Sequence, residues 1–413
     1  MKTVIVGGGV VGLCSAYYLS RSGAEVVVID GDPARQASCS DGNAGMVVPS
    51  HFVPLAAPGV ISQGLKWMLN PKSPFYLRPR PDLNLMKWCW LFMRHSNEAH
   101  VKSCEHLLRD LSLESRRLFV DLAKEEDFEL VQKGLLMLCA SEAGLEEEAE
   151  VAEHANRLGI EAEVCDLDRL KELEPGVELA VKGGVWFGQD CHLNPSIFLA
   201  KLREAVVREG GEFIEGRVSH YLRDKGTISG VQLRDGVKVK GDKLVLAGGV
   251  EAPALMKEFG LKLPMQGGKG YSLTLKEPRK ALQLCSLLKE GRVAVTPMGD
   301  QLRVAGTMEI CGEDLSLNKR RIAGILESFV QFYPEFSKED FEGVEPWSGL
   351  RPCTPDGLPY LGKLEKEPNV VVAAGHSMVG LSLGPVTGQI VSRLVSGEDP
   401  EFDLHQLRSE RFG

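Results

Sequence analysis

The apolar and polar positions of the first thirty residues follow two different spacings. Lys2–Val6 is a short run rich in β-branched residues, and Glu25–Ile29 is a second run of the same kind. Between them, apolar residues recur at helical spacing from Leu13 to Leu19. A short continuous apolar run is typical of a buried strand, whereas a period near 3.6 indicates a helix. The pattern therefore predicts a strand, a helix and a second strand, which is how an α/β fold opens.

The same spacings return in the second half of the chain. Gly183–Phe187 and Phe213–Val218 predict two strands. Between them, Asn194 is placed as a helix N-cap and Pro195 as the first helical residue, since Asn can accept from the first turn and Pro lacks an N–H there. This helix is expected to end near Glu209.

The remaining patterns indicate hairpins, helices and further strands. Ser219–Lys243 alternates polar and apolar residues around two turn signals, which predicts hairpins. Lys243–Gly249 predicts a buried strand that ends in a pair of glycines. Helical patterns dominate residues 50–150, whereas residues 265–345 contain several strand-like runs. The chain therefore combines an α/β part with a second part that mixes helices and a sheet.

Composition and charge narrow the classes of protein that fit this pattern. The chain has 413 residues, 43% hydrophobic and 25% charged residues, and a net charge of −9. These values are typical of globular proteins and exclude a disordered chain, and the acidic balance argues against nucleic acid as a partner. The ten cysteines are scattered without a C-x-x-C pair, so neither a metal site nor a disulfide framework is expected.

Three stretches lack formal charge, namely residues 3–20, 42–65 and 369–392. Glycines interrupt the first and third and prolines the second, so none of them predicts a membrane-spanning helix. We therefore expect a cytoplasmic protein. The apolar, Trp-containing segments Leu65–Leu69 and Leu83–Met93 leave open a peripheral contact with the inner face of the cell membrane, although a buried helix explains them as well.

Glycines and an acid at fixed spacing give the first two strands a chemical meaning. Gly7-x-Gly9-x-x-Gly12 joins the first strand to the helix, and Asp30 ends the second strand. In this setting the first glycine makes a tight turn, the second lets the backbone approach a pyrophosphate, and the third lets the helix pack on the sheet. The acid accepts hydrogen bonds from a ribose. The segment therefore predicts a dinucleotide site.

The residues that follow decide between FAD and NAD. The helix opens at Val10 and Val11, where N–H groups and the positive end of the dipole are expected to meet the phosphates. Ser38–Met46 is a small polar loop that can bring the backbone close to a bulky flavin, a mere exposed turn being the alternative. The cofactor contacts expected in this loop are Ser40, Asn43, Ala44, Gly45 and Met46.

Two later segments return to the predicted cofactor. Val218 is placed where a third parallel strand touches the adenine. Gly248 and Gly249 end the buried strand and again permit close approach of the backbone to the cofactor. These segments predict a Rossmann-like FAD-binding domain assembled from distant parts of the chain.

The C-terminal region carries the most specific motif. Trp347–Pro359 is followed by Ala373–His376 and by Gly380–Pro385, which opens a helical pattern. This combination resembles the D-amino-acid oxidase superfamily of flavoproteins, and most of all its branch of D-amino-acid dehydrogenase small chains. The resemblance covers nearly the whole chain, including Asn43–Gly45 and Lys269–Thr274. It implies an FAD-dependent enzyme that oxidises amines.

The resemblance and the patterns together predict an α/β fold with two interleaved domains. One is the FAD-binding Rossmann-like domain, and the other is an α+β substrate-binding domain with a mainly antiparallel sheet. The FAD-binding domain is expected to comprise residues 1–48, 150–262 and 346–413, and the substrate-binding domain residues 49–149 and 263–345.

The resemblance also implies roles for individual residues. Arg351 is expected to hold the substrate carboxylate, which needs a bidentate guanidinium partner on leaving water. Tyr271 is expected to reach this carboxylate or to wall the pocket, an ordinary sheet tyrosine being the alternative. His376 is expected to hydrogen-bond or tune the flavin, with a structural histidine equally open. The remaining flavin contacts expected here are Gly349, Gly375, Gly380, Leu381 and Ser382.

The implied reaction is hydride transfer from the substrate Cα to the flavin, which gives an imino acid and then a 2-oxo acid. A helix that starts over Gly380–Leu383 is expected to stabilise negative charge on the reduced flavin. Cys353 stands at a different offset from the cysteine that links flavin in sarcosine-oxidase relatives, so non-covalent FAD is expected. The branch favours a quinone-like electron acceptor.

Several alternatives stay open. An oxidase for glycine, sarcosine or another secondary amine would pass its electrons to oxygen. A dehydrogenase for D-proline or hydroxy-D-proline would make the same demands on the carboxylate and amine. A flavin-binding protein without turnover would serve assembly or electron relay. Relatives form hetero-oligomers, and the sequence leaves both homo- and hetero-oligomers open.

Overall fold

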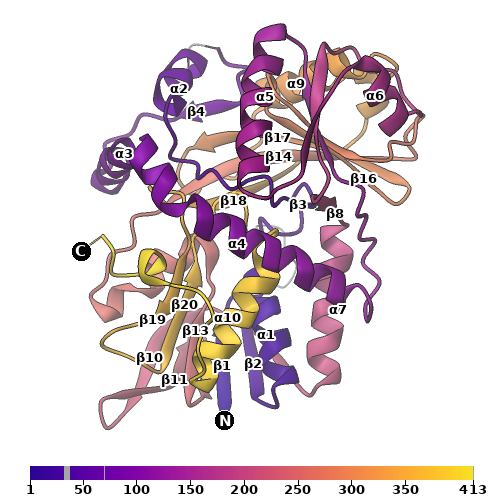
Figure 1. The fold of residues 1–413 in the computed structure, drawn as a ribbon. Coiled ribbons are helices and arrows are strands. Elements are labelled where there is room, and N and C mark those ends of the chain that lie inside the picture. The colour runs from indigo at the N-terminus through magenta and orange to yellow at the C-terminus, as the bar shows by residue number, and fades with distance from the viewer. Residues whose placement is uncertain (32–37, 69, 413) are drawn as a thin grey trace.

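The computed structural model describes residues 1–31, 38–68 and 70–412. Two large sheets, each with its own apolar core, lie one above the other (Figure 1). The lower half of the figure contains a mostly parallel sheet, and the upper half contains a mostly antiparallel one. The long helix α4 (Glu98–Leu122) runs across the boundary between them. The predicted α/β fold class is confirmed.

The lower sheet is built around the predicted opening unit. β1 pairs in parallel with β2 on one side and with β13 on the other, with Val4 beside Val27 and Leu244. Only β19 runs antiparallel among the described strands of this sheet. In spatial order its strands are β19 (Tyr360–Lys363), β20 (Val370–Ala374), β13 (Lys243–Leu246), β1 (Lys2–Val6), β2 (Glu25–Asp30) and β9 (Glu212–Glu215).

Both faces of the lower sheet are covered, which explains why its strands are apolar throughout. Helices α1 (Val10–Arg21), α7 (Pro195–Arg208) and α10 (Gly384–Ser396) pack on one face. The predicted cap of α7 is confirmed, because Asn194 accepts from Ile197 N and Pro195 opens the helix. The other face is covered by the predicted hairpins β10 (Val218–Asp224), β11 (Thr227–Leu233) and β12 (Lys238–Lys240), and by α8 (Ala252–Leu255) with its flanking 3-10 turns at Gly249–Glu251 and Lys257–Phe259.

The upper sheet is mainly antiparallel, as expected. Among its described pairs, only β5 with β15 and β4 with β17 run parallel. In spatial order its strands are β18 (Trp347–Cys353), β14 (Gln266–Lys276), β17 (Gln301–Ile310), β16 (Val293–Met298), β15 (Cys285–Leu288), β5 (Leu135–Cys139), β7 (Gly183–Phe187) and β6 (Ala162–Cys165), with β4 (Phe75–Leu77) beside β17.

Helix α9 (Lys319–Phe332) packs on one face of the upper sheet, where Phe329 and Phe332 are buried. A two-stranded ladder of β3 (Met46–Val47) with β8 (Cys191–His192) connects the loops between the sheets. The remaining elements are α2 (Val60–Met68), α3 (Leu83–His95), α5 (Glu142–Arg157), α6 (Leu167–Leu173) and the 3-10 turns Lys338–Phe341 and His405–Leu407.

Three strands lie in a different sheet from the one that the predicted domain division implies. The division places residues 150–187 and 347–353 with the cofactor domain, but β6, β7 and β18 all pair within the upper sheet. Strand β18 pairs with β14 over seven residues, from Trp347 to Cys353. The reason is physical, since a strand's partner is chosen by cross-strand packing, which the local pattern does not report.

Candidate active site

The glycine-rich turn after β1 is a place where side chains do not fit. Gly7 has a φ of +117°, and a Cβ there would lie 2.3 Å from Ala247 O. A Cβ on Gly12 would lie 1.9 Å from Gly7 O. At Gly9 the nearest neighbour of a Cβ would be Ser40 Oγ at 3.4 Å, which is ordinary contact. The turn itself therefore requires glycine at positions 7 and 12, whereas a Cβ on Gly9 would fit against Ser40.

The second strand delivers its acid to this turn. A Cβ on Gly8 would lie 2.3 Å from Asp30 Oδ2, so the carboxylate rests on the Gly8 backbone. Asp30 thus lies at the N-terminal end of α1, where its predicted ribose contact requires it. The contact of Gly8 with Asp30 was not predicted, although three consecutive glycines at positions 7–9 were a signal for a close approach.

The predicted flavin loop closes over the start of α1. Helix α1 has Gly9 as its N-cap and no capping side chain of its own, and Val10 N donates to Ser40 Oγ at 3.1 Å. Asn43 Oδ1 accepts from Gly45 N at 2.9 Å, which fixes the loop internally. The loop then enters β3 at Met46, and Ala44 packs beside it. The structure therefore brings Ser40 to the glycine turn and leads the rest of the loop into β3.

The C-terminal segment returns to the same place. Ser382 Oγ accepts from Val48 N at 3.0 Å, and Leu381 is buried. The predicted helix start is wrong by four residues, because α10 begins at Gly384, with Pro385 in its first turn. Proline fixes the helix start there, since it has no N–H to donate. Gly380 consequently lies in the turn before the helix.

Four of the predicted cofactor glycines differ in their surroundings. Gly375 has a φ of +79°, and a Cβ there would lie 2.7 Å from Thr354 Cγ2. Gly248 is crowded by Leu255, whereas nothing lies within 4 Å of a Cβ on Gly249. A Cβ on Gly349 would overlap the ring of Trp347 at 2.1 Å.

Val218 does not lie in a parallel strand as predicted, whereas its contact with the adenine stays a prediction. The parallel strand β9 ends at Glu215, and Val218 is the first residue of the antiparallel β10. Gly216 N still donates to Asp30 O at 3.0 Å, so the chain leaves the parallel sheet beside the acid. The sequence does contain a signal for this break, because Gly216 and Arg217 interrupt the segment Phe213–Val218 where the chain turns.

Arg351 lies in the middle of β18, and its guanidinium rests on the backbone of β14. A Cβ on Gly270 would lie 2.1 Å from Arg351 Nη1. Nη1 donates to Thr307 O at 2.9 Å, and no carboxylate of the described residues lies within ion-pair distance. Burial lowers the pKa of Arg351. A desolvated cation without a counter-ion is costly, so this site favours an anionic ligand.

Thr307 supplies the carbonyl that orients Arg351, and it does so in a strained conformation. Its φ is +71°, which is rare for a β-branched residue. The pairing of β14 with β17 shifts at this point, between Lys269 and Tyr271. Strain of this kind costs about 1–3 kcal/mol and persists where the surrounding structure enforces it. Thr307 gave no signal in the sequence.

The predicted role of Tyr271 is wrong. Successive strand residues face opposite sides of a sheet, and Gly270 faces Arg351, so Tyr271 faces away from it. Its side chain is 1% exposed beneath α9, and its hydroxyl donates to Glu309 Oε2 at 3.1 Å. Burial raises the pKa of this phenol. Tyr271 belongs to a buried ionic cluster with Glu309 and Lys269 behind the sheet.

His376 has a partner within the protein. Its Nε2 lies 3.0 Å from Thr387 Oγ1 in α10, and its backbone bridges to Cys353. Burial lowers the pKa of His376 to about 4, so the imidazole is neutral at pH 7. These contacts favour the structural alternative, in which the histidine connects α10 to β18. The neutral imidazole argues against a positive charge on His376 that would tune the flavin.

A buried acid supports the loop that follows β3. Asp190 is fully buried and accepts from Ser50 N at 3.0 Å and from Ser50 Oγ at 2.5 Å. Ser50 Oγ also lies 3.1 Å from His51 Nδ1. Burial raises the pKa of Asp190 to about 7 and lowers that of His51 to about 4. Between about pH 4 and pH 7, the Asp190 carboxyl is therefore protonated and the His51 imidazole is neutral, so both groups are uncharged.

The titration of Asp190 makes stability depend on pH. Its folded pKa of about 7 exceeds the unfolded value of about 3.9, so the folded state loses stability as pH rises from about 4 to 7. We expect Asp190→Asn to remove this loss. The free energy of unfolding of the variant minus that of wild type should increase by about 2–4 kcal/mol when the pH is raised from about 4.5 to about 8. Denaturant unfolding at both pH values measures this, and a constant difference would contradict it.

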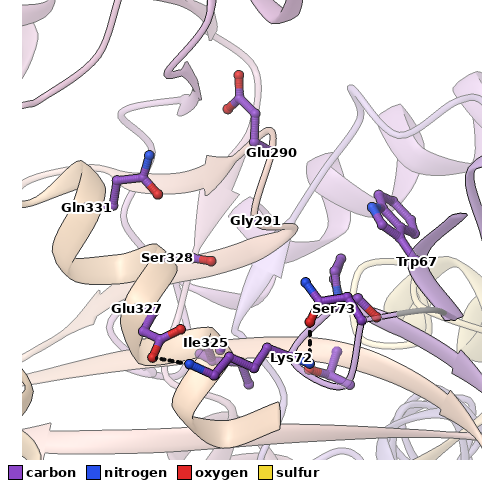
Figure 2. A pocket seen from close by; sticks show the side chains of 13 residues that line it. Trp67, Lys72, Ser73, Glu290, Gly291, Ile325, Glu327, Ser328 and Gln331 are labelled. Atoms are coloured by element: carbon purple, nitrogen blue, oxygen red, sulfur yellow. Dashed lines mark hydrogen bonds and ion pairs between the residues drawn. The ribbon is translucent and has the colours of Figure 1, made fainter. Parts of the chain in front are cut away.

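A cavity of about 310 Å³ lies elsewhere, between α2, α9 and the turn at Glu290–Gly291 (Figure 2). Of the charged groups that line it, Lys72 and Glu327 pair with each other at 2.7 Å, and Glu290 accepts from Ser141 Oγ at 2.7 Å. Thr307 lines it, but neither Arg351 nor any predicted cofactor residue does. We therefore place the active site at the Arg351 face of the upper sheet and not in this cavity.

Gly270 is expected to support the anion site, because it leaves room for the Arg351 guanidinium. In Gly270→Ala the new methyl would overlap the guanidinium and displace it from the strand. We expect KM for the substrate to rise about tenfold while FAD affinity stays within about twofold, and the tenfold rise corresponds to about 1.4 kcal/mol. Steady-state kinetics and FAD titration measure the two effects. An unchanged KM would show that Arg351 does not bind substrate from its present position.

Comparison with known proteins identifies the family and the fold. The chain matches the family model described as FAD dependent oxidoreductase over residues 2–394. Over its whole length it is 32% identical to a D-amino acid dehydrogenase of Methylobacterium nodulans and 30% identical to one of Granulibacter bethesdensis, covering 99% and 100% of those proteins. Its structure is similar to a glycine oxidase from Geobacillus kaustophilus, with a TM-score of 0.78 at 24% identity over 99% of this chain and 98% of that one.

Proposed function

Because the chain belongs to the family of FAD-dependent oxidoreductases, we propose that it oxidises D-amino acids to imino acids, which water hydrolyses to 2-oxo acids and ammonia. The observation that carries this proposal is the desolvated guanidinium of Arg351, which has no carboxylate partner among the described residues. Full-length relatives named D-amino acid dehydrogenase, at 30% and 32% identity, support the D configuration and the dehydrogenase activity.

The chain's own residues bind and orient the substrate in this proposal. Arg351 donates from Nη1 to Thr307 O, and its other N–H groups bind the substrate carboxylate. Gly270 leaves room for the guanidinium to lie flat on β14. Bound FAD supplies the acceptor for the hydride that leaves the substrate Cα. Catalysis then comes mainly from positioning and electrostatics, and we assign no proton transfer to His376 or Tyr271.

The glycine turn and its neighbours fit FAD. We propose that the Gly7–Gly12 turn binds the pyrophosphate, that Asp30 binds a ribose, and that Ser40–Met46 and Gly375–Ser382 contact the flavin. The steric limits at Gly7 and Gly12 and the position of Asp30 on Gly8 support this assignment.

We also propose that FAD is bound without a covalent link. Cys353 has no exposed surface, and its Sγ lies 3.7 Å from Met308 Sδ. Burial raises its pKa to about 12, so the thiol is a poor nucleophile at neutral pH. Acid precipitation of the protein is expected to release all of the flavin, and yellow colour retained in the pellet would contradict this.

For the electron acceptor we propose a quinone reached at a membrane surface. Helix α3 exposes an apolar stripe, and residues 60–95 contain six Lys or Arg and one Asp, although the whole chain has a net charge of −9. Arg94 lies over the ring of Trp90, 4.8 Å from its centroid. A basic, apolar helix face suits the surface of an anionic bilayer. The exposed side chains are Leu83 (82%), Met86 (63%), Trp90 (50%) and Met93 (55%).

One finding limits the membrane proposal to a peripheral contact, which we propose lies at the inner face. Among the described residues, no helix is both long and apolar enough to cross a bilayer. The neighbouring α2 exposes Leu65, whereas Leu69, the end of the predicted segment, lies outside the described residues.

The α3 surface is tested by cosedimentation with vesicles. We expect the wild type to bind vesicles that contain anionic phospholipid and not neutral ones. The double variant Met86→Ser and Trp90→Ser should reduce binding at least about fivefold, because it removes apolar area that enters the bilayer surface. Val207→Ser, which removes an exposed apolar side chain on α7, is the matched control. Failure of the wild type to bind anionic vesicles would contradict the peripheral contact.

Product analysis with a panel of amines tests the function itself. D-amino acids, including D-proline and hydroxy-D-proline, are expected to give 2-oxo acids or imines with a quinone analogue as acceptor, without equivalent hydrogen peroxide. Peroxide in equal amount to product, with glycine or sarcosine as the best substrate, would move the protein to the oxygen-using oxidases. FAD binding without turnover of any amine would indicate an electron-relay protein.

A further inference from the structure

A second arginine connects the substrate sheet to the flavin loop. Arg303 lies on β17 and is 9% exposed. Its Nη1 donates to the carbonyl oxygens of Asp41 at 3.0 Å and Asn43 at 2.8 Å, and its Nε donates to Thr274 Oγ1 at 3.0 Å. We propose that Arg303 is a positioning residue for FAD, which holds the 40–45 loop in its cofactor-binding conformation from the substrate side.

The contacts of Arg303 are unusual for a buried cation. Its guanidinium donates to three neutral oxygens, and no carboxylate of the described residues lies within ion-pair distance. Burial lowers its pKa, and only the charge of Asp41 opposes this. A buried cation without a paired acid is costly to keep. A neutral side chain would be less costly if only core packing were required here.

A second residue of the same sheet, Trp347, contacts the 40–45 loop. The ring of Trp347 on β18 lies against Gly42, where a Cβ would come within 2.1 Å of the ring. Gly42 lies between Asp41 and Asn43, whose carbonyls Arg303 holds. Strands β17 and β18 therefore fix three consecutive loop residues from two sides.

The loop transmits this constraint to the cofactor turn. Ser40, next to the clamped residues, accepts from Val10 N at the start of α1. Gly45 N is held by the Asn43 side chain. Release of these contacts therefore affects both the helix N-terminus and the entry to β3, which are two of the places where FAD contacts are expected. Affinity gained by holding a binding loop in its bound conformation is lost when the loop is freed.

The test measures FAD binding to apo-protein by flavin fluorescence. Arg303→Met removes the donors and is expected to raise the Kd for FAD at least about tenfold, because the freed loop must be ordered again on binding. Arg303→Lys keeps a charged donor and should restore part of the affinity. Arg116→Met is the matched control, because Arg116 donates to the carbonyl of Gln189, outside the loop, and its Kd should stay close to that of wild type.

A purely structural role for Arg303 gives a different result. In that case Arg303→Met lowers the melting temperature of the apo-protein but leaves the Kd for FAD nearly unchanged, which would overturn the proposal. If Arg303→Met does not fold, Gly42→Ala is used instead, since it pushes the same loop away from Trp347. Its Kd is expected to rise at least about threefold for the same reason, and an unchanged value would also overturn the proposal. FAD binding is measured without substrate, so a wrong amine assignment leaves this outcome unaffected.

Discussion

Arg351→Met is expected to raise KM for the substrate more than about a hundredfold while FAD stays bound. In the variant, the substrate carboxylate would enter a desolvated site without the guanidinium of Arg351. Leaving one partner of a buried ion pair unmatched costs about 3–5 kcal/mol, and each step of about 1.4 kcal/mol is a factor of ten. The guanidinium reaches this site from β18 across Gly270, so methionine of similar length keeps the packing.

Steady-state kinetics and FAD titration of the same preparation measure both effects. Arg351→Lys is the matched variant, because it keeps the charge and loses the bidentate fork, and it should fall between wild type and Arg351→Met. A near-normal KM in Arg351→Met would show that the substrate does not bind at this face of the sheet. Loss of FAD in that variant would instead show that Arg351 serves the cofactor.

Gly12→Val is expected to abolish FAD binding. A Cβ at this position would lie 1.9 Å from Gly7 O, so α1 must move away from β1 and open the turn. The backbone donors at the start of α1 and the carboxylate of Asp30 would then no longer meet at one site. Overpacking at such a contact also costs about 1–3 kcal/mol of stability.

The flavin content of the purified variant and the Kd of its apo-protein for FAD measure this loss. Gly64→Ala in α2 is the control, since a Cβ there meets only the Phe75 ring at 3.3 Å, away from the turn. Stoichiometric FAD in Gly12→Val would show that the cofactor does not depend on the packing of α1 against β1.

The opening unit of the fold could be predicted from the sequence because its signals are local. The β-branched runs of β1 and β2, the glycines between them and the Asn194 cap each act within a few residues. The steric limit at Gly12 is also local, because it comes from Gly7 O, whereas the limit at Gly7 combines its φ of +117° with the distant Ala247 O. Ser40 of the predicted flavin loop lies beside the start of α1, and the contact of this loop with the flavin stays a prediction.

Features that depend on distant partners could not be predicted in this way. Which face of β14 meets Arg351 is decided by pairing with β18 and β17, and the role that the resemblance implied for Tyr271 does not fit the face on which its side chain lies. The positions of β6 and β7 in the upper sheet depend on β5, which lies outside the segment predicted for the cofactor domain. Arg303 and Thr307 gave no local signal, since their roles arise only when β17 meets the flavin loop and β18.

The central claim, that FAD in this protein is reduced by D-amino acids bound through Arg351, is tested most directly by anaerobic titration of the holoenzyme. The visible flavin band is followed while D-amino acids, their L counterparts, glycine and sarcosine are added in turn. We predict that D-amino acids bleach the band and that L-amino acids do not, with the bleaching shifted to much higher concentration in Arg351→Met. A band that no D-amino acid bleaches, or that only L-amino acids bleach, would contradict the account.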